Sequence, residues 1–219
     1  MFIFLLRHAE GSDFRNKWQT PDSPLSDLGI RQAQNLSGLT RFKRVDLILS
    51  SKWRRAAETA KIISKLLKKP LEFFEGINER EQHSKIYGAD RLSDISKRYY
   101  NESIENYNDL DWKFEDDEES VRDISKRAFN FSKHLTKKHL NQNLLVVSHD
   151  MFIRCFITIC LLGKNYEDKV FNKIYRSLQV MNTGVSLLEY IEKRKTWKIW
   201  YLNDFSHLSK IKKEEKIKG

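Results

Sequence analysis

Cysteine is scarce in this chain, which has two cysteines, three prolines and eight glycines in 219 residues. Cys155 and Cys160 lie five positions apart in one apolar segment, so on a helix they would face different sides, and no Cys-rich cluster accompanies them. We therefore expect buried thiols, and neither a disulfide framework nor a zinc site. A chain of this length buries roughly 70% of its unfolded surface without such cross-links.

Long hydrophobic runs are also missing. The best candidate for a membrane span, residues 151–162, is interrupted by Arg154 and is too short to cross a bilayer. The N-terminus lacks the basic start, apolar stretch and small-residue cleavage site of a secretion signal. We expect a cytoplasmic protein with no membrane partner.

The sequence contains no Gly-x-Ser-x-Gly elbow of the kind that serine hydrolases use. Ser148, His149 and Asp150 are adjacent, whereas the members of a catalytic triad meet in space from separate segments. The serine hydrolase class is therefore excluded.

Charge, in contrast, is plentiful and unbalanced, with a formal net charge of +10. Two explanations compete for this excess. The protein could bind a nucleic acid or an anionic surface, or it could have a Lys-rich exterior and act on an anionic substrate. No nucleic-acid-binding motif is present, and the densest basic run, residues 210–218, has the character of a solvated tail. We expect a Lys-rich tail at 205–219, a small phosphorylated substrate and no nucleic-acid partner, while a homodimer stays open.

Short apolar runs alternate with helical patterns along most of the chain, which predicts an α/β fold. Buried strands are predicted at 2–6, 45–49, 71–74 and 144–147, helices at 27–37, 53–69, 120–135 and 150–162, a short helix and then a strand within 170–181, and an edge hairpin at 185–191 and 195–202. We expect one domain over residues 1–204, a three-layer α/β/α sandwich with a mostly parallel sheet. Aromatic and acidic residues without a regular pattern at 82–117 predict an inserted cap of short helices.

Basic or acidic side chains follow the strands at their carboxyl ends, where open α/β sheets bind their ligands. These residues are Arg7, His8, Arg55, Glu79 and His149. Arginine does not ligate metals, so the set is a poor metal site, but guanidinium groups bind phosphoryl oxygens in pairs and stabilise the charge that develops during phosphoryl transfer. We therefore expect a phosphate site with no metal and no cofactor.

Positive neighbours favour a neutral imidazole, which is a competent nucleophile near pH 7, and one carboxyl group could serve first as acid and then as base. Glu79 is the candidate, although it could equally be an exposed loop residue paired with Arg80. Lys52 and Arg54 crowd the start of the helix at 53–69, where a ligand anion or simple extension into solvent would relieve their repulsion from the helix dipole.

Taken in order, several short motifs resemble the histidine phosphatase superfamily, which has the phosphoglycerate mutase-like fold. The matching pieces are Leu6-Arg-His-Ala-Glu10, Leu25-Ser-Asp-Leu-Gly29, Ser50-Ser51 with Arg55, Ile77-Asn-Glu-Arg80, Glu119-Ser120 with Arg127, and Ser148-His149. The resemblance implies that His8 is phosphorylated, that Arg7, Arg55 and His149 hold the phosphoryl group, and that Glu79 is the proton donor. Asn16 and Arg80 are expected to contact substrate.

Three positions depart from the family pattern. Ala9 stands where many relatives have glycine, Asp150 replaces the usual glycine after the second histidine, and Phe14 occupies the place of a phosphate-contacting asparagine of the mutases. The loop around Phe14, together with the short segment between Glu79 and His149, favours a phosphomonoesterase over a phosphoglycerate mutase-type transferase. A non-catalytic adaptor that binds phosphorylated ligands is the alternative from another class, and a sugar phosphate, a nucleotide and a phosphopeptide all stay open as substrates.

Overall fold

The computed structural model describes residues 1–12, 15–38 and 40–208. Its centre is a six-stranded sheet in the order β3-β2-β4-β1-β5-β6. The strands are β1 (Phe2–Arg7), β2 (Leu47–Ser50), β3 (Leu71–Phe73), β4 (Leu144–Ser148), β5 (Val185–Ile191) and β6 (Thr196–Asp204). The first four strands in chain order run parallel to one another, whereas β5 and β6 are antiparallel and form the edge hairpin.

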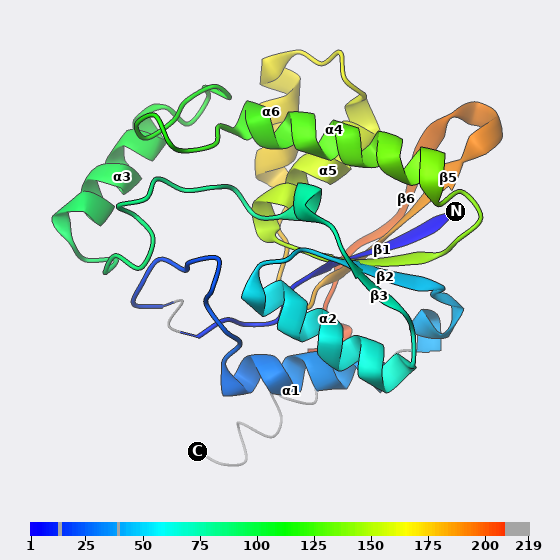
Figure 1. Ribbon diagram of the computed structural model, residues 1–219. Coiled ribbons are helices and arrows are strands. Elements are labelled where there is room, and N and C mark those ends of the chain that lie inside the picture. The colour runs from blue at the N-terminus through cyan, green and yellow to red at the C-terminus, as the bar shows by residue number, and fades with distance from the viewer. Residues whose placement is uncertain (13–14, 39, 209–219) are drawn as a thin grey trace.

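Helices cover both faces of this sheet, as Figure 1 shows. On one face lie α4 (Val121–Lys138), α5 (Asp150–Leu162) and α6 (Asp168–Ser177), and on the other lie α1 (Asp27–Asn35) and α2 (Arg54–Leu67). Short 3-10 helices occupy Leu36–Gly38, Thr40–Arg44, Glu75–Ile77, Glu192–Arg194 and Ser206–Leu208. The predicted three-layer α/β fold with a mostly parallel sheet is confirmed.

The alternation of β1 explains the two cores. Successive side chains of a strand point to opposite faces of the sheet, and a strand between two helical layers must be apolar on both. Ile3 and Leu5 belong to the core beneath α4 and α5, whereas Phe4 and Leu6 belong to the core beneath α2. The continuous apolar run at the start of the chain is therefore a strand buried on both faces.

Helix starts follow the sequence closely. The hydroxyl of Ser26 accepts a hydrogen bond from the Gly29 amide at the start of α1, and Ser120 and Asp123 form a capping box at the start of α4. The Cys155 and Cys160 thiols are free and buried in the core, as predicted. Within the part of the chain that is described, no helix is both long and apolar enough to span a membrane.

Some predicted boundaries were wrong. The strand predicted within 170–181 does not form, because α6 continues to Ser177 and the next residues, up to Met181, are irregular. The second strand begins at Leu47, two residues late, since a 3-10 helix extends to Arg44. The helix expected to reach residue 37 changes to 3-10 geometry after Asn35. Of the tail predicted at 205–219, residues 209–219 lie outside the described residues.

The cap is simpler than predicted, because residues 82–117 contain one α-helix, α3 (Asp94–Glu105). It lies beyond the end at which β1 finishes (Figure 1). Ile86, Tyr99 and Phe114 form a small core of its own, against which Trp18 of the loop after β1 packs. Beneath this core the Arg80 and Glu118 side chains form a buried ion pair of 2.8 Å.

Candidate active site

Two histidines meet because β1 and β4 are parallel neighbours in register. Arg7 is paired with Ser148 across the two strands, so the next residues, His8 and His149, leave the sheet side by side. Their ring centroids are 4.9 Å apart. The His8 amide donates to the Ser148 carbonyl at 2.9 Å, which continues the ladder one step past the strand ends and holds the two residues together.

The hydrogen bonds of His8 define its tautomer. Nδ1 lies 2.7 Å from the Ala9 carbonyl, which can only accept, and Nε2 lies 3.0 Å from Arg55 Nε, which can only donate. The ring is therefore neutral, with its proton on Nδ1 and its lone pair on Nε2. Burial, Arg55 and Arg7 hold the pKa of His8 well below its usual value, which keeps this form at neutral pH.

Arg55 comes from the first turn of α2 and is 4% exposed. Its Nη1 donates to the Thr20 carbonyl at 2.9 Å, and its guanidinium lies 5.0 Å from the ring centre of Trp53. Burial lowers its pKa to about 10, so it stays charged at neutral pH. An arginine in this position lies at the positive end of the helix dipole, which is an environment suited to an anion.

The two other cations near this turn have ordinary partners. Lys52 Nζ contacts Glu75 at 2.5 Å, and Arg54 Nε contacts Glu58 at 2.9 Å. Both pairs are largely exposed. Of the three cations that crowd the start of α2, Arg55 alone reaches the histidines.

His149 is the residue before α5, and its ring is fully buried. Ser51 Oγ uses its single proton on Asn78 Oδ1 at 2.8 Å, so His149 Nε2 donates to Ser51 at 2.8 Å. That leaves His149 Nδ1 as an unprotonated, buried atom with no partner among the described residues. Burial, together with Arg55, lowers the pKa of His149 well below its usual value.

Arg7 supplies a second guanidinium at the end of β1. Its Nη1 donates to the Val180 carbonyl at 2.6 Å and lies 3.9 Å from Asp150 Oδ1. Its Nε is buried and has no hydrogen-bond partner within the described ranges. Asp150, the residue that departs from the family pattern, is itself fixed by Arg154 at 2.7 Å.

Glu79 faces the start of α5. One carboxylate oxygen accepts from the amides of Arg80 and Met151, both at 3.1 Å, and from that of Phe152 at 3.3 Å. Burial raises its pKa, and Asp150 raises it further, although Arg55 and the backbone amides act in the opposite sense. The alternative of an exposed Glu79 paired with the Arg80 side chain is thereby wrong, because that guanidinium pairs with Glu118.

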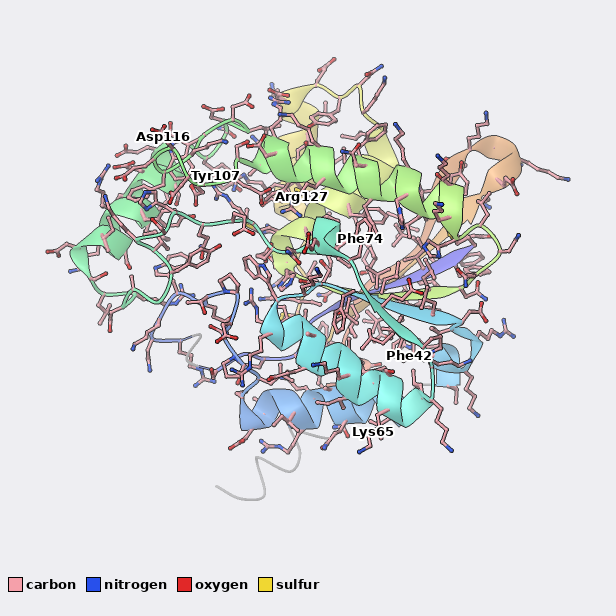
Figure 2. The ribbon with its side chains drawn as sticks, viewed as in Figure 1. Phe42, Lys65, Phe74, Tyr107, Asp116 and Arg127 are labelled. Carbon is pink, nitrogen blue, oxygen red and sulfur yellow. The ribbon has the colours of Figure 1, made fainter. Side chains whose placement is uncertain are left out.

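Arg127 fixes the loop that carries Glu79. From α4, its guanidinium donates to the carbonyls of Gly76, Asn78 and Glu79 at 3.0–3.2 Å. The same group binds both carboxylate oxygens of Glu119 at 2.7–2.8 Å. Figure 2 shows Arg127 between α4 and this loop. Sequence reasoning noted all four of these residues, Ser51, Asn78, Glu119 and Arg127, only as parts of motifs. It did not predict that Ser51 binds His149 or that Asn78 binds Ser51.

The two other residues predicted to contact substrate, Arg80 and Asn16, make their contacts with residues in or beside the cap. The Arg80 guanidinium is directed into the cap, where it contacts Glu118 and the Glu119 carbonyl. Asn16 is exposed, and its carbonyl accepts from the Arg91 amide. Phe14 lies outside the described residues. Over the part of the chain that is described, no group of three or more His, Cys, Asp or Glu side chains could hold a metal ion.

Five residues predicted to be catalytic, which we call the catalytic cluster after that prediction, combine an unprotonated imidazole nitrogen, two guanidiniums and a carboxyl group of raised pKa. They are Arg7, His8, Arg55, Glu79 and His149. The model of the histidine phosphatase superfamily (branch 1) matches residues 3–203, so the chain belongs to that superfamily. The expected enzyme class, a phosphoric monoester hydrolase, is confirmed at this level.

Individual relatives extend over most of the chain. It is 26% identical over 212 residues to an uncharacterized phosphatase, PhoE, of Bacillus subtilis, covering 94% of this chain and 96% of the relative. It is 30% identical over 156 residues to an adenosylcobalamin/alpha-ribazole phosphatase of Escherichia coli, covering 68% and 73%. The structure resembles a phosphoserine phosphatase mutant of Entamoeba histolytica solved with phosphoserine, with a TM-score of 0.75, 23% identity and coverage of 94% and 98%.

Proposed function

We propose that this protein hydrolyses a small phosphate monoester through a phosphohistidine intermediate on His8. The observation that carries the proposal is the tautomer of His8, because the Ala9 carbonyl holds the proton on Nδ1 and leaves the Nε2 lone pair directed at Arg55. An imidazole nitrogen that is both unprotonated and beside a fixed cation meets the two needs of a nucleophile that attacks a phosphoryl group.

In the first step, the phosphoryl oxygens accept hydrogen bonds from Arg7 and Arg55. Arg55 Nε then donates to the ligand and no longer to His8 Nε2. His8 Nε2 then forms a bond to phosphorus while the bond from phosphorus to the ester oxygen breaks. Glu79, in the protonated form that its raised pKa favours, gives its proton to the departing alcohol oxygen. The charge on the equatorial oxygens is stabilised by the guanidiniums, so the proposal involves no metal or cofactor.

In the second step, the now ionised Glu79 accepts a proton from water as the water oxygen attacks phosphorus. The phosphorus–nitrogen bond breaks, orthophosphate is formed, and His8 returns to its neutral form with Glu79 reprotonated. One carboxyl group thus acts in both directions, which requires that it stay in place. The three backbone amides at Glu79 and the hold of Arg127 on its loop provide that fixed position.

The relatives support a small phosphate ester as the substrate. Two of those reported above are named as an adenosylcobalamin/alpha-ribazole phosphatase and a phosphoserine phosphatase. The leaving group is expected to face the cap and the loop after β1, which pack against each other through Trp18 and Tyr99. The predicted contacts of Asn16 and Arg80 with substrate play no part in these steps; Asn16 is exposed, and the Arg80 side chain pairs with Glu118.

The test is hydrolysis of an aryl phosphate by the wild type in the presence of a chelator, together with isolation of the phosphoenzyme. We expect acid-labile, base-stable phosphate on the wild type, and loss of both label and turnover in His8→Ala. His134→Gln, a partly buried histidine on α4, is the matched control and should keep both. Full activity in His8→Ala would refute the mechanism.

The same samples separate the two alternatives. A phosphoglycerate mutase would need a bisphosphorylated cofactor for sustained turnover and would isomerise phosphoglycerate faster than it hydrolyses it. An adaptor would bind a phosphorylated ligand while the wild type stays inert and unlabelled.

A further inference from the structure

A second basic groove lies between the cap and α6. Its volume is about 610 Å³, and none of its residues belongs to the catalytic cluster. The cap groove, as we name it, is lined by Tyr107, Asn108, Lys169, Asn172, Lys173, Arg176 and Ser177. This cavity is large enough for a small ligand.

The charge of the cap groove is uncompensated by its own lining. Lys169, Lys173 and Arg176 follow one another on successive turns of α6, whereas none of the lining residues is acidic. Like charges at this spacing destabilise a helix. The acid next in the sequence, Asp168, is bound to Arg122 of α4 and is therefore committed elsewhere. Three cations around one cavity with no carboxylate form a site whose missing component is an anion.

Arg176 is fixed in place rather than extended into solvent. Its Nη2 donates to the Tyr107 carbonyl and its Nε donates to Asn172 Oδ1 at 3.2 Å. The guanidinium lies 3.6 Å from the ring centre of Tyr107. Nη1 makes no hydrogen bond to any described residue, so its N–H donors are available to a ligand. Because the guanidinium is already held in place, binding a ligand costs less side-chain entropy.

The cap groove is lined by residues of both the cap and α6. Tyr107 and Asn108 belong to the turn after α3, and Figure 2 shows Tyr107 at the junction of the cap with the helical layer. Asn172 Nδ2 donates to the Asn108 carbonyl at 2.7 Å, which is a direct tie between cap and α6. A ligand here would contact both sides and strengthen that tie.

We propose that the cap groove binds a multiply charged anion of the phosphate type. Three positive charges within one groove match several negative charges better than one, and guanidinium and ammonium groups are the common partners of phosphate oxygens. The anion could be a free oligophosphate or a second phosphate carried by the substrate, and the chemistry of recognition is the same for both.

The test of binding uses tripolyphosphate as the probe. Because the catalytic cluster would also bind it, calorimetry is carried out in an Arg55→Ala background, where the cap groove is intact. Adding Lys169→Glu and Lys173→Glu should raise the Kd at least tenfold, which is about 1.4 kcal/mol or more. Higher salt should weaken binding in the background protein, because the contacts are exposed to solvent.

The matched control is Lys61→Glu with Lys65→Glu in the same background. These two lysines are also exposed and one turn apart, but they lie on α2, on the other face of the sheet, and Figure 2 shows Lys65 there. This pair gives the same change in net charge and should leave the Kd within about threefold of the background value. Equal effects of the two pairs, or no effect of either, would overturn the proposal, because binding would then depend on overall charge or on another site.

A second measurement distinguishes a free oligophosphate from a second phosphate carried by the substrate. It uses enzyme in which Arg55 is present. If the groove receives a second phosphate of the substrate, Lys169→Glu with Lys173→Glu should lower kcat/KM for fructose 1,6-bisphosphate about tenfold relative to kcat/KM for an aryl phosphate. If it receives a free anion, that ratio stays at the wild-type value while the affinity for tripolyphosphate still falls. The wild type could hydrolyse no phosphate ester while tripolyphosphate binding still depends on Lys169 and Lys173. That result would refute the phosphatase proposal and support the proposed anion site in the cap groove.

Discussion

Arg127 offers the sharpest test of how the acid is positioned, because it contacts the loop of Glu79 and none of the reacting groups. The replacement Arg127→Lys keeps the positive charge but cannot reproduce the fork that binds Glu119 and the three carbonyls. A lysine can retain one or two of these five bonds. A buried hydrogen bond to a charged group contributes about 1.5–3 kcal/mol to folding stability. The Arg127 side chain is partly exposed, so hydrogen bonds to water make up part of each loss.

We therefore expect a loss of about 2–3 kcal/mol of folding stability, measured by urea denaturation. The loop should also shift, and a displacement of the acid by about 1 Å costs on the order of 100-fold in rate. That loss should depend on the leaving group. Alkyl phosphates need a proton on the departing oxygen and should lose the full factor, whereas p-nitrophenyl phosphate, whose phenolate leaves unaided, should lose much less.

Two comparisons distinguish positioning from general damage. Arg122→Lys, on the same helix and bound to Asp111 and Asp168, loses a similar set of ion pairs but should leave the ratio of alkyl to aryl turnover unchanged. Combining Arg127→Lys with Glu79→Gln should cost little more than Glu79→Gln alone, because both act through one proton transfer. An Arg127→Lys enzyme that loses alkyl and aryl turnover equally would refute the reasoning.

The remaining predictions concern three carboxyl groups. Glu79→Gln should reduce kcat for alkyl phosphates by about 10²–10⁴-fold and that for p-nitrophenyl phosphate far less, as measured by phosphate release. Asp150→Asn removes a negative charge that raises the pKa of Glu79, so the alkaline limb of kcat/KM, where the acid loses its proton, should move to lower pH; an unmoved or raised limb would contradict this. Glu118→Gln strands the buried charge of Arg80 and should destabilise the fold by about 3 kcal/mol or more in urea, whereas Glu105→Gln on the exposed end of α3 should be neutral.

The sequence predicted the parts of the fold that depend on periodicity. The apolar runs of β1 and β4 and the capping signal at Ser120 are local features, and each has the expected structure. The strand predicted near Val180 does not form, because Val180 is buried by packing in the core rather than by pairing in the sheet, while Met181 is 40% exposed. Local patterns do not distinguish these two kinds of burial.

The site was predictable where a residue type and a strand end coincide, as at His8 and His149. Arg80 shows the limit of that reasoning, because its place after a strand suggested a substrate contact, whereas Glu118, almost forty residues later, draws it into the cap. Arg127 shows the converse, since nothing in the spacing of α4 predicts that it binds the carbonyls of a loop fifty residues earlier. Contacts between distant segments depend on tertiary packing, which one sequence does not reveal.

The electrostatics of the catalytic cluster favour an anion in it. Arg55 is nearly fully buried and donates to a neutral histidine and a carbonyl, and no carboxylate of the described residues accepts a hydrogen bond from it. Burying a charge without a hydrogen-bonded carboxylate is costly, and a buried donor without a partner, here Arg7 Nε, is uncommon in folded proteins. A phosphoryl group entering between Arg55 and Arg7 would offset the charge of both arginines. The stability lost in assembling the cluster is then the source of its affinity, so anion binding should raise the melting temperature of the wild type more than that of Arg55→Ala.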